Sequence, residues 1–131
     1  MMFRKPFALA ALSIVSAPLF AHHSAAAEYV SQLSTWQAVI TRFSWMNPHT
    51  FVYFEAKNPS GVMTKYECEG SAPSGLTGNG WTRNTIKPGD HVTIRGYRAK
   101  DRPDGCKVRA VILADGHEMF MGWDGSDGTG R

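Results

Sequence analysis

Residues 50–69 read TFVYFEAKNPSGVMTKYECE and contain the clearest fold signal in the chain. Two runs rich in aromatic and β-branched residues, 50–57 and 62–69, flank the turn sequence Asn-Pro-Ser-Gly at 58–61. Runs of this kind, separated by a short turn that contains proline and glycine, are typical of a β-hairpin.

The β pattern extends to both sides of this hairpin. Upstream, residues 35–45 alternate, and we expect Val39, Thr41, Phe43 and Trp45 to share one face of a strand. Downstream, four glycines and a proline interrupt the pattern, and at most a short helix fits there. The turn sequence Lys-Pro-Gly-Asp and two further polar turns then separate three more predicted strands, at residues 91–98, 106–113 and 117–121.

Five or six short strands, with one irregular crossover between the third and the fourth, predict an all-β domain. The position of the crossover favours a small five- to six-stranded barrel like the oligonucleotide/oligosaccharide-binding (OB) fold, and a β-sandwich is the alternative. The predicted organisation is a signal peptide at 1–21, an N-terminal arm at 22–34, the OB-like barrel at 35–121 and a flexible tail at 122–131.

The first 21 residues have the features of an export signal. Arg4 and Lys5 precede an uninterrupted run of apolar and small residues at 7–17, and Pro18 ends that run. A basic start, an apolar stretch of about 7–15 residues and a small residue at the cut define a secretory signal peptide, whereas a membrane-spanning helix needs about 20 residues. We therefore expect a periplasmic or secreted protein without a membrane span.

Two cleavage points compete, and they leave different N-termini. Cleavage after Ala21 makes His22 the first residue of the mature chain, whereas cleavage after Ala27 removes both His22 and His23. Cleavage after Ala27 fits the preference for small residues before the cut better, but it would give the signal peptide an unusually long and polar C-terminal region. We favour cleavage after Ala21.

Composition narrows the classes of function. The chain has 131 residues, of which 43% are hydrophobic and 19% are charged, enough for one compact domain. Its formal charge is +3, but without Arg4 and Lys5 the 14 basic residues become 12 against 11 acidic ones, which leaves +1. A mature chain this close to neutral has no strong electrostatic attraction for nucleic acid, so we expect no nucleic-acid partner.

Cys68 and Cys106 are most simply explained as a disulfide, because the chain is predicted to be exported. The bridge would clamp the crossover, and closing a loop of about 39 residues is worth about 4 kcal/mol in the chain-entropy model. A thiolate metal site is the alternative, and no CxxC spacing supports redox catalysis.

Histidines at the start of the mature chain suggest a metal site. If cleavage follows Ala21, His22 offers its α-amine and its imidazole to the same ion, and another imidazole such as that of His23 can complete a histidine brace. Amine and imidazole nitrogens suit Cu(II), and the α-amine loses its proton at about pH 8, so a metal displaces that proton easily. Copper is therefore the candidate cofactor.

The candidates for a further ligand are His49, which follows Pro48 in a turn, and His117, at the start of the last predicted strand. Met119 and Met121 follow His117 at a spacing of two and share its strand face, and imidazole with thioether would suit Cu(I). The alternative assigns the histidines to solvent or to turns and the methionines to the core.

No catalytic residue is assigned, because the sequence contains no phosphate loop, HExxH motif or nucleophile motif, and we expect no enzyme. Glu67 and Glu69 share a strand face, but their alternation with Tyr66 and Cys68 favours a simple solvent face. Two hypotheses remain. One is an exported binding or accessory module that holds copper through its N-terminal histidine. The other is a metal-free module that docks an unidentified protein or envelope component.

Five landmarks occur in order along the mature chain: Ala-His-His-Ser at 21–24, Trp-Met-Asn-Pro-His at 45–49, Gly-Trp at 80–81, Lys-Pro-Gly-Asp at 87–90 and Gly-Tyr-Arg-Ala-Lys-Asp at 96–101. In these the chain resembles a family of small exported bacterial proteins known only as a domain of unknown function. The resemblance implies an exported OB-like barrel without an assigned activity. The chain departs from the family pattern in its two cysteines and in the methionines of its last strand.

Overall fold

The computed structural model describes residues 25–122, which form six strands and two short helices. In chain order these are α1 (Ala25–Glu28), β1 (Tyr29–Ser44), β2 (Phe51–Lys57), β3 (Met63–Glu69), α2 (Pro73–Gly78), β4 (His91–Ala99), β5 (Gly105–Ile112) and β6 (Glu118–Phe120). The predicted all-β fold is confirmed. The predicted signal peptide, His22, His23 and residues 123–131 of the predicted tail lie outside the described residues.

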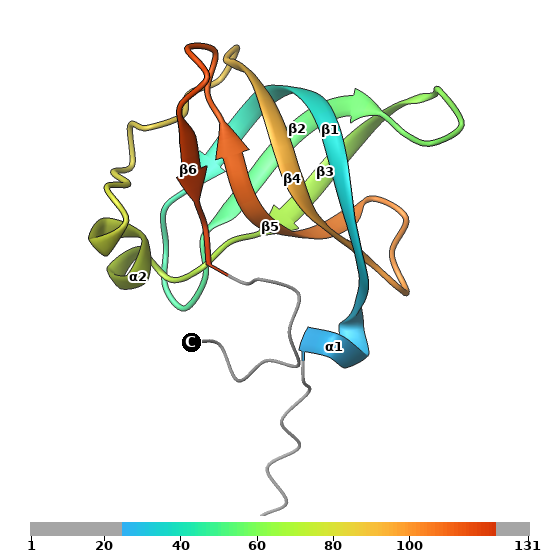
Figure 1. Cartoon of the computed structure of the whole chain (residues 1–131), viewed down its shortest axis with the longest axis horizontal. Coiled ribbons are helices and arrows are strands. Elements are labelled where there is room, and N and C mark those ends of the chain that lie inside the picture. Colours follow the sequence, from blue (N-terminus) through green and yellow to red (C-terminus); the bar gives the residue numbers. More distant parts are fainter. Residues whose placement is uncertain (1–24, 123–131) are drawn as a thin grey trace, which may run out of the picture.

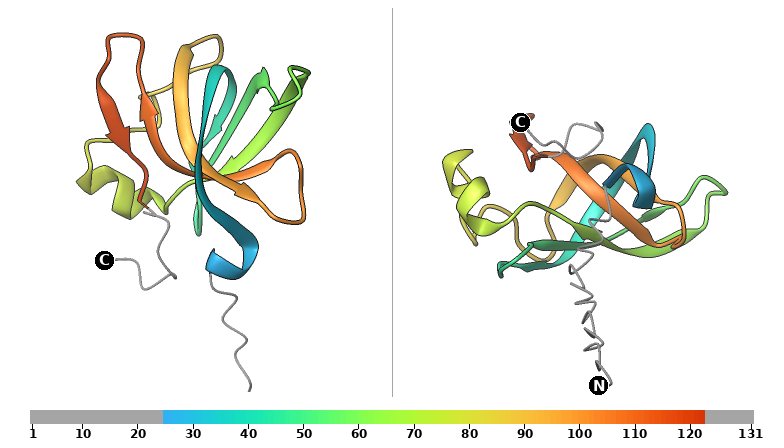
Figure 2. Two further views of the ribbon diagram at one scale, coloured as in Figure 1. Left: turned by 45° about the vertical axis from the view of Figure 1, so that its right-hand side comes forward. Right: turned by 90° about the horizontal axis from the view of Figure 1, so that it is seen from below.

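Five of the six strands close into a ring (Figures 1 and 2). The sheet order is β3-β2-β1-β4-β5-β6, and a further pairing between β3 and β5 completes the circuit. That closing pair is parallel, whereas every other pair is antiparallel. The chain is therefore barrel-like, as predicted, with β6 added beside β5.

β1 begins at Tyr29, although the arm was predicted to continue to residue 34. The strand pairs with β4 from Tyr29 to Val39 and with β2 from Val39 to Ser44. Its first half lacks a clear hydrophobic alternation, and the pairing with β4 determines its conformation there. One long strand thus pairs with two neighbouring strands in succession, which allows the sheet to curl around the core.

The predicted shared face of β1 is wrong. The register of β1 against β2 shifts between residues 40 and 42, which is the signature of a β-bulge. Thr41 is exposed and Val39 is half-buried, whereas Phe43 and Trp45 beyond the shift pack against the core. The bulge exchanges the two faces of the strand, and sequence alternation alone does not reveal it.

The crossover between β3 and β4 carries α2, the short helix that the sequence allowed, and contributes to the core. Leu76, Trp81 and Ile86 are buried with the inward side chains of the strands. The indole Nε1 of Trp81 donates a hydrogen bond to the carbonyl oxygen of Phe120 at 2.8 Å. The crossover is therefore bound to β6 as well as to the core.

The predicted turns are also present. In the β2–β3 turn the Asn58 side-chain oxygen accepts hydrogen bonds from the amides of Ser60 and Val62, each at 2.9 Å, and Gly61 has a φ of +80°. Gly89, in the turn before β4, has a φ of +91°, and its amide donates to the Ile40 carbonyl at 2.7 Å. Glycine is suited to both positions because it carries no Cβ.

The predicted Cys68–Cys106 disulfide is present and lies at the seam of the ring, the short parallel pairing between β3 and β5. Only three residue pairs make this seam, and the two cysteines are the middle pair, with their Cα atoms 4.5 Å apart. Both side chains are buried. The covalent bond therefore reinforces the shortest contact in the ring.

We expect the Cys68→Ala/Cys106→Ala variant to lose about 4 kcal/mol of unfolding free energy, because the unfolded chain is no longer cross-linked. Urea unfolding of the two proteins with and without dithiothreitol measures the loss. The reductant should bring the native chain to the level of the variant and leave the variant unchanged. The prediction would be contradicted if the urea midpoint of the native chain stayed the same after its disulfide had been reduced in the fully unfolded state.

Candidate functional site

A cluster of polar side chains gathers around Glu69, at the end of β3. Its carboxylate accepts a hydrogen bond from the Tyr29 hydroxyl at 3.2 Å and lies 3.1 Å from Nδ1 of His49. The Lys107 ammonium lies 3.4 Å from the same carboxylate oxygen as His49. Four parts of the fold meet here: the start of β1, the β1–β2 loop, the end of β3 and the first half of β5.

Strand register explains how the sequence builds this Glu69 cluster. Glu69 is paired with Phe51 on β2 and with Lys107 on β5, next to the disulfide. Because Cys68 points into the core, Glu69 and its two partners point outward, as adjacent strand residues must. Glu67 and Glu69 thus share the outward face of β3, as predicted, but this is not a simple solvent face, because the Glu69 side chain is only 20% exposed and contacts Tyr29, His49 and Lys107.

Partial burial and the neighbouring carboxylate change the chemistry of Tyr29. Burial raises the pKa of its phenol well above the ordinary value, and the charge of Glu69 and the hydrogen bond to it raise the pKa further. Tyr29 consequently remains a hydrogen-bond donor to Glu69 throughout the neutral and mildly alkaline range.

The raised pKa of Tyr29 makes stability depend on alkaline pH. Above about pH 10 a tyrosine in the unfolded chain releases its proton while the folded chain still holds it, so stability falls as pH rises from there. We expect Tyr29→Phe to make the urea midpoint less sensitive to pH between about 9 and 11. Tyr53→Phe, which removes a phenol outside the Glu69 cluster, is the matched control, and equal slopes for the two variants would contradict the prediction.

The two alternative candidates for the further metal ligand, His49 and His117, lie far apart in the fold. His49 lies in the loop between β1 and β2, whereas His117 lies in the turn between β5 and β6, and Figures 1 and 2 show these connections at opposite ends of the molecule. The His117 amide donates to the Asp115 carboxylate at 2.9 Å within that turn. Among residues 25–122 no three His, Cys, Asp or Glu side chains are grouped to hold a metal ion.

The two predicted soft ligands lie at the core. Met121 is completely buried, and Met119 is partly buried against the same apolar cluster. Gly70, in the crossover, has Met121 as a close neighbour. The positions of the methionines fit the core-filling role that was the alternative to a thioether site.

A cleft of about 530 Å³ lies beside the Glu69 cluster. Its aromatic walls are Tyr29 and Phe51, and backbone and small side chains come from the neighbouring ends of β4 and β5. The charged groups that line it are Glu28, Glu67, Glu69, Asp101 and Arg102.

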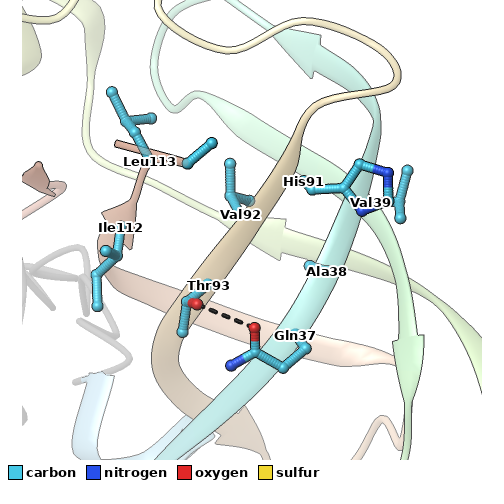
Figure 3. Close-up of a pocket in the computed structure, with 9 residues that line it drawn as sticks. Gln37, Ala38, Val39, His91, Val92, Thr93, Ile112 and Leu113 are labelled. Atoms are coloured by element: carbon cyan, nitrogen blue, oxygen red, sulfur yellow. Dashed lines mark hydrogen bonds between the residues drawn. The ribbon is translucent and has the colours of Figure 1, made fainter. Parts of the chain in front are cut away.

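A second hollow, of about 380 Å³, crosses the outer surface of β1, β4 and the end of β5 (Figure 3). Figure 3 shows the hydroxyl of Thr93 bonded to the side-chain oxygen of Gln37, at 3.2 Å, with His91 at one side. No carboxylate and no Lys or Arg lines this hollow. The hollow therefore has few groups that could bind a charged ligand, and the cleft beside Glu69 is the better candidate site.

Sequence reasoning missed several members of the candidate site: Tyr29 and Lys107 of the Glu69 cluster, and Glu28, Asp101 and Arg102 of the cleft. Tyr29 was placed in the irregular arm, and the two basic residues showed no motif. One signal could have found Lys107. If Cys68 and Cys106 are bonded in adjacent parallel strands, the residues that follow them, Glu69 and Lys107, must also be neighbours.

Comparison with known proteins gives one match. Residues 10–107 match the model of a family described as a family of unknown function, DUF6152. No curated protein and no solved structure matches the chain. Within residues 25–122, neither helix has the length and apolar character needed to cross a membrane.

Proposed function

The chain belongs to a family of unknown function, and we propose from the geometry of its site that it is an exported binding module that holds a copper-type metal ion between His22 and His49. The observation that carries this proposal is the contact between His49 Nδ1 and Glu69, at 3.1 Å. Export itself is part of the proposal, and the disulfide supports it, because such bonds persist in oxidising compartments.

The contact with Glu69 gives His49 the arrangement of a metal-binding histidine. A histidine that ligates a metal through one ring nitrogen almost always donates the N–H of the other to a carboxylate or carbonyl. With Nδ1 facing Glu69, His49 offers Nε2 as the ligand. Its side chain is 47% exposed, so an ion can reach it from solvent.

The start of the described chain lies close to the same cluster. Tyr29 bonds to Glu69, and Glu28 lines the adjoining cleft. Only three residue steps separate His22 from Ala25, the first residue of α1, a reach of at most about 11 Å for an extended chain. If cleavage follows Ala21, the proposal requires the α-amine and imidazole of His22, with His23 beside it, to lie within this reach of His49.

The other predicted ligands receive less support. His117 belongs to the β5–β6 turn, and Figure 1 shows that turn at the opposite end of the molecule from α1 and the β1–β2 loop. Met121 is enclosed in the core, so a thioether site at this position would require the core to open. The proposed donor set is thus made of nitrogen atoms, which suits Cu(II).

A metal-free docking module is the second candidate. Val62 and Met63, at the tip of the β2–β3 hairpin, are 59% and 62% exposed, and Met46 in the β1–β2 loop is 52% exposed. Val62 and Met63 adjoin each other at this tip, and an exposed apolar pair there would suit contact with a protein or an envelope component. The circuit β1-β2-β3-β5-β4 supports the OB-like classification, whose ligands commonly bind on β2, β3 and the adjoining loops.

Native mass spectrometry of the chain purified from a bacterial periplasm, without added metal, tests the proposal directly. We expect a chain that begins at His22, is lighter by the two hydrogens of the disulfide and carries one copper ion. A chain that begins at Glu28, or one that begins at His22 and remains metal-free when copper is supplied, would exclude the brace and favour the docking module.

Ligand variants test the donor set. We expect His22→Ala and His49→Ala to abolish stoichiometric Cu(II) binding in titration calorimetry, and Glu69→Gln to weaken it by about 10–100-fold, because His49 loses its orienting carboxylate. His117→Ala is the matched control and should bind like the native chain. Native affinity in His49→Ala, or a loss confined to His117→Ala, would refute the assigned ligands.

A further inference from the structure

The cleft beside the Glu69 cluster has features of a ligand site that are independent of copper. Its volume of about 530 Å³ lies within the range of small-molecule sites, about 300–1,000 Å³. Gly105 makes part of its lining without a side chain, and a Cβ there would approach Ala99 and Arg102 to 3.2 Å. A glycine at this position therefore allows the β4–β5 loop to lie close to the start of β5.

Charge favours a cation in this cleft. Four carboxylates line it, those of Glu28, Glu67, Glu69 and Asp101, against one guanidinium, that of Arg102. Lys107 and His49 already engage Glu69. The guanidinium of Arg102 lies 3.8 Å from the Glu67 carboxylate and 3.6 Å from the Asp104 carboxylate, so it pairs with both. The negative charge of the cleft thus exceeds what its own basic groups balance, and an anion or a nucleic-acid backbone would be repelled.

The aromatic rings narrow the class of cation. Tyr29 and Phe51 line the same cleft as the carboxylates, and an ammonium group near an aromatic face gains cation–π attraction. One of these rings already makes this type of contact, since the Lys107 ammonium lies 5.9 Å from the centre of the Tyr29 ring. Rings beside carboxylates suit an organic ammonium better than a bare metal ion, because the ring faces attract ammonium groups and hydrocarbon but supply no oxygen ligand.

We propose that this cleft binds a small organic polyamine cation, with its ammonium groups on Glu28, Glu67 and Asp101 and its methylene chain against Tyr29 and Phe51. The three carboxylates come from α1, β3 and the β4–β5 loop, so the ligand would bridge three parts of the fold. This site goes beyond the proposed copper function and does not require it.

Spermidine is the probe, titrated into the full exported chain in metal-free, low-salt buffer and followed by amide chemical shifts and calorimetry. We expect saturable binding with shifts concentrated at residues of the cleft, and weaker binding as salt rises. Triethylene glycol, a neutral chain of similar length, should not bind. Equal binding of the neutral chain, or no saturable binding of spermidine, would overturn the proposal.

Three variants should change the affinity for spermidine in opposite directions. Glu67→Gln and Asp101→Asn should each weaken spermidine binding about two- to fivefold, whereas Arg102→Gln should tighten it by a similar factor, because the competing cation is gone. Glu55→Gln, which removes a carboxylate of β2 outside the cleft, is the matched control and should bind like the native chain. Weakening by Arg102→Gln, or native affinity in both carboxylate variants, would overturn the assignment.

Discussion

The short parallel seam between β3 and β5 is the contact on which the rest of the structure depends. Three residue pairs and one disulfide join two strands that the chain reaches by separate routes, one before the crossover and one after β4. The same register places Glu69 beside Lys107 and Glu67 beside Gly105. Closure of the ring and the juxtaposition of Glu69 with Lys107 therefore depend on the same register, and a shift of that register would disrupt both.

β1 contributes the second constraint. It is long enough to pair first with β4 and then with β2, and the bulge between Ile40 and Arg42, near the start of the β2-paired stretch, lets both halves direct side chains into the core. Because its first residue is Tyr29, the strand also brings the start of the described chain to Glu69. The location of the N-terminal end near the candidate site follows from the pairing with β4, and not from any local preference of residues 29–34.

Local chemistry made much of the fold predictable. The β2–β3 hairpin, the glycine turn before β4 and the outward position of Glu69 all follow from alternation and turn residues, and the cysteine pair follows from the expected compartment. The bulge could not be predicted, because it is defined by a partner strand. Tyr29 and Arg102 were missed for the same reason: their roles arise from contacts with β3 that are distant in sequence.

The bond between Trp81 and Phe120 has a consequence for association between chains. β5 is paired with β4 along one edge, and along its other edge first with β3 and then with β6, so among residues 25–122 the outer side of β6 is a sheet edge. Unpaired edges of this kind recruit strands from other molecules. Here the Trp81 indole donates to the Phe120 carbonyl and the Ser71 hydroxyl donates to the Met121 carbonyl. A strand from a second copy would first have to displace a buried tryptophan, so the crossover protects the chain against edge-to-edge aggregation.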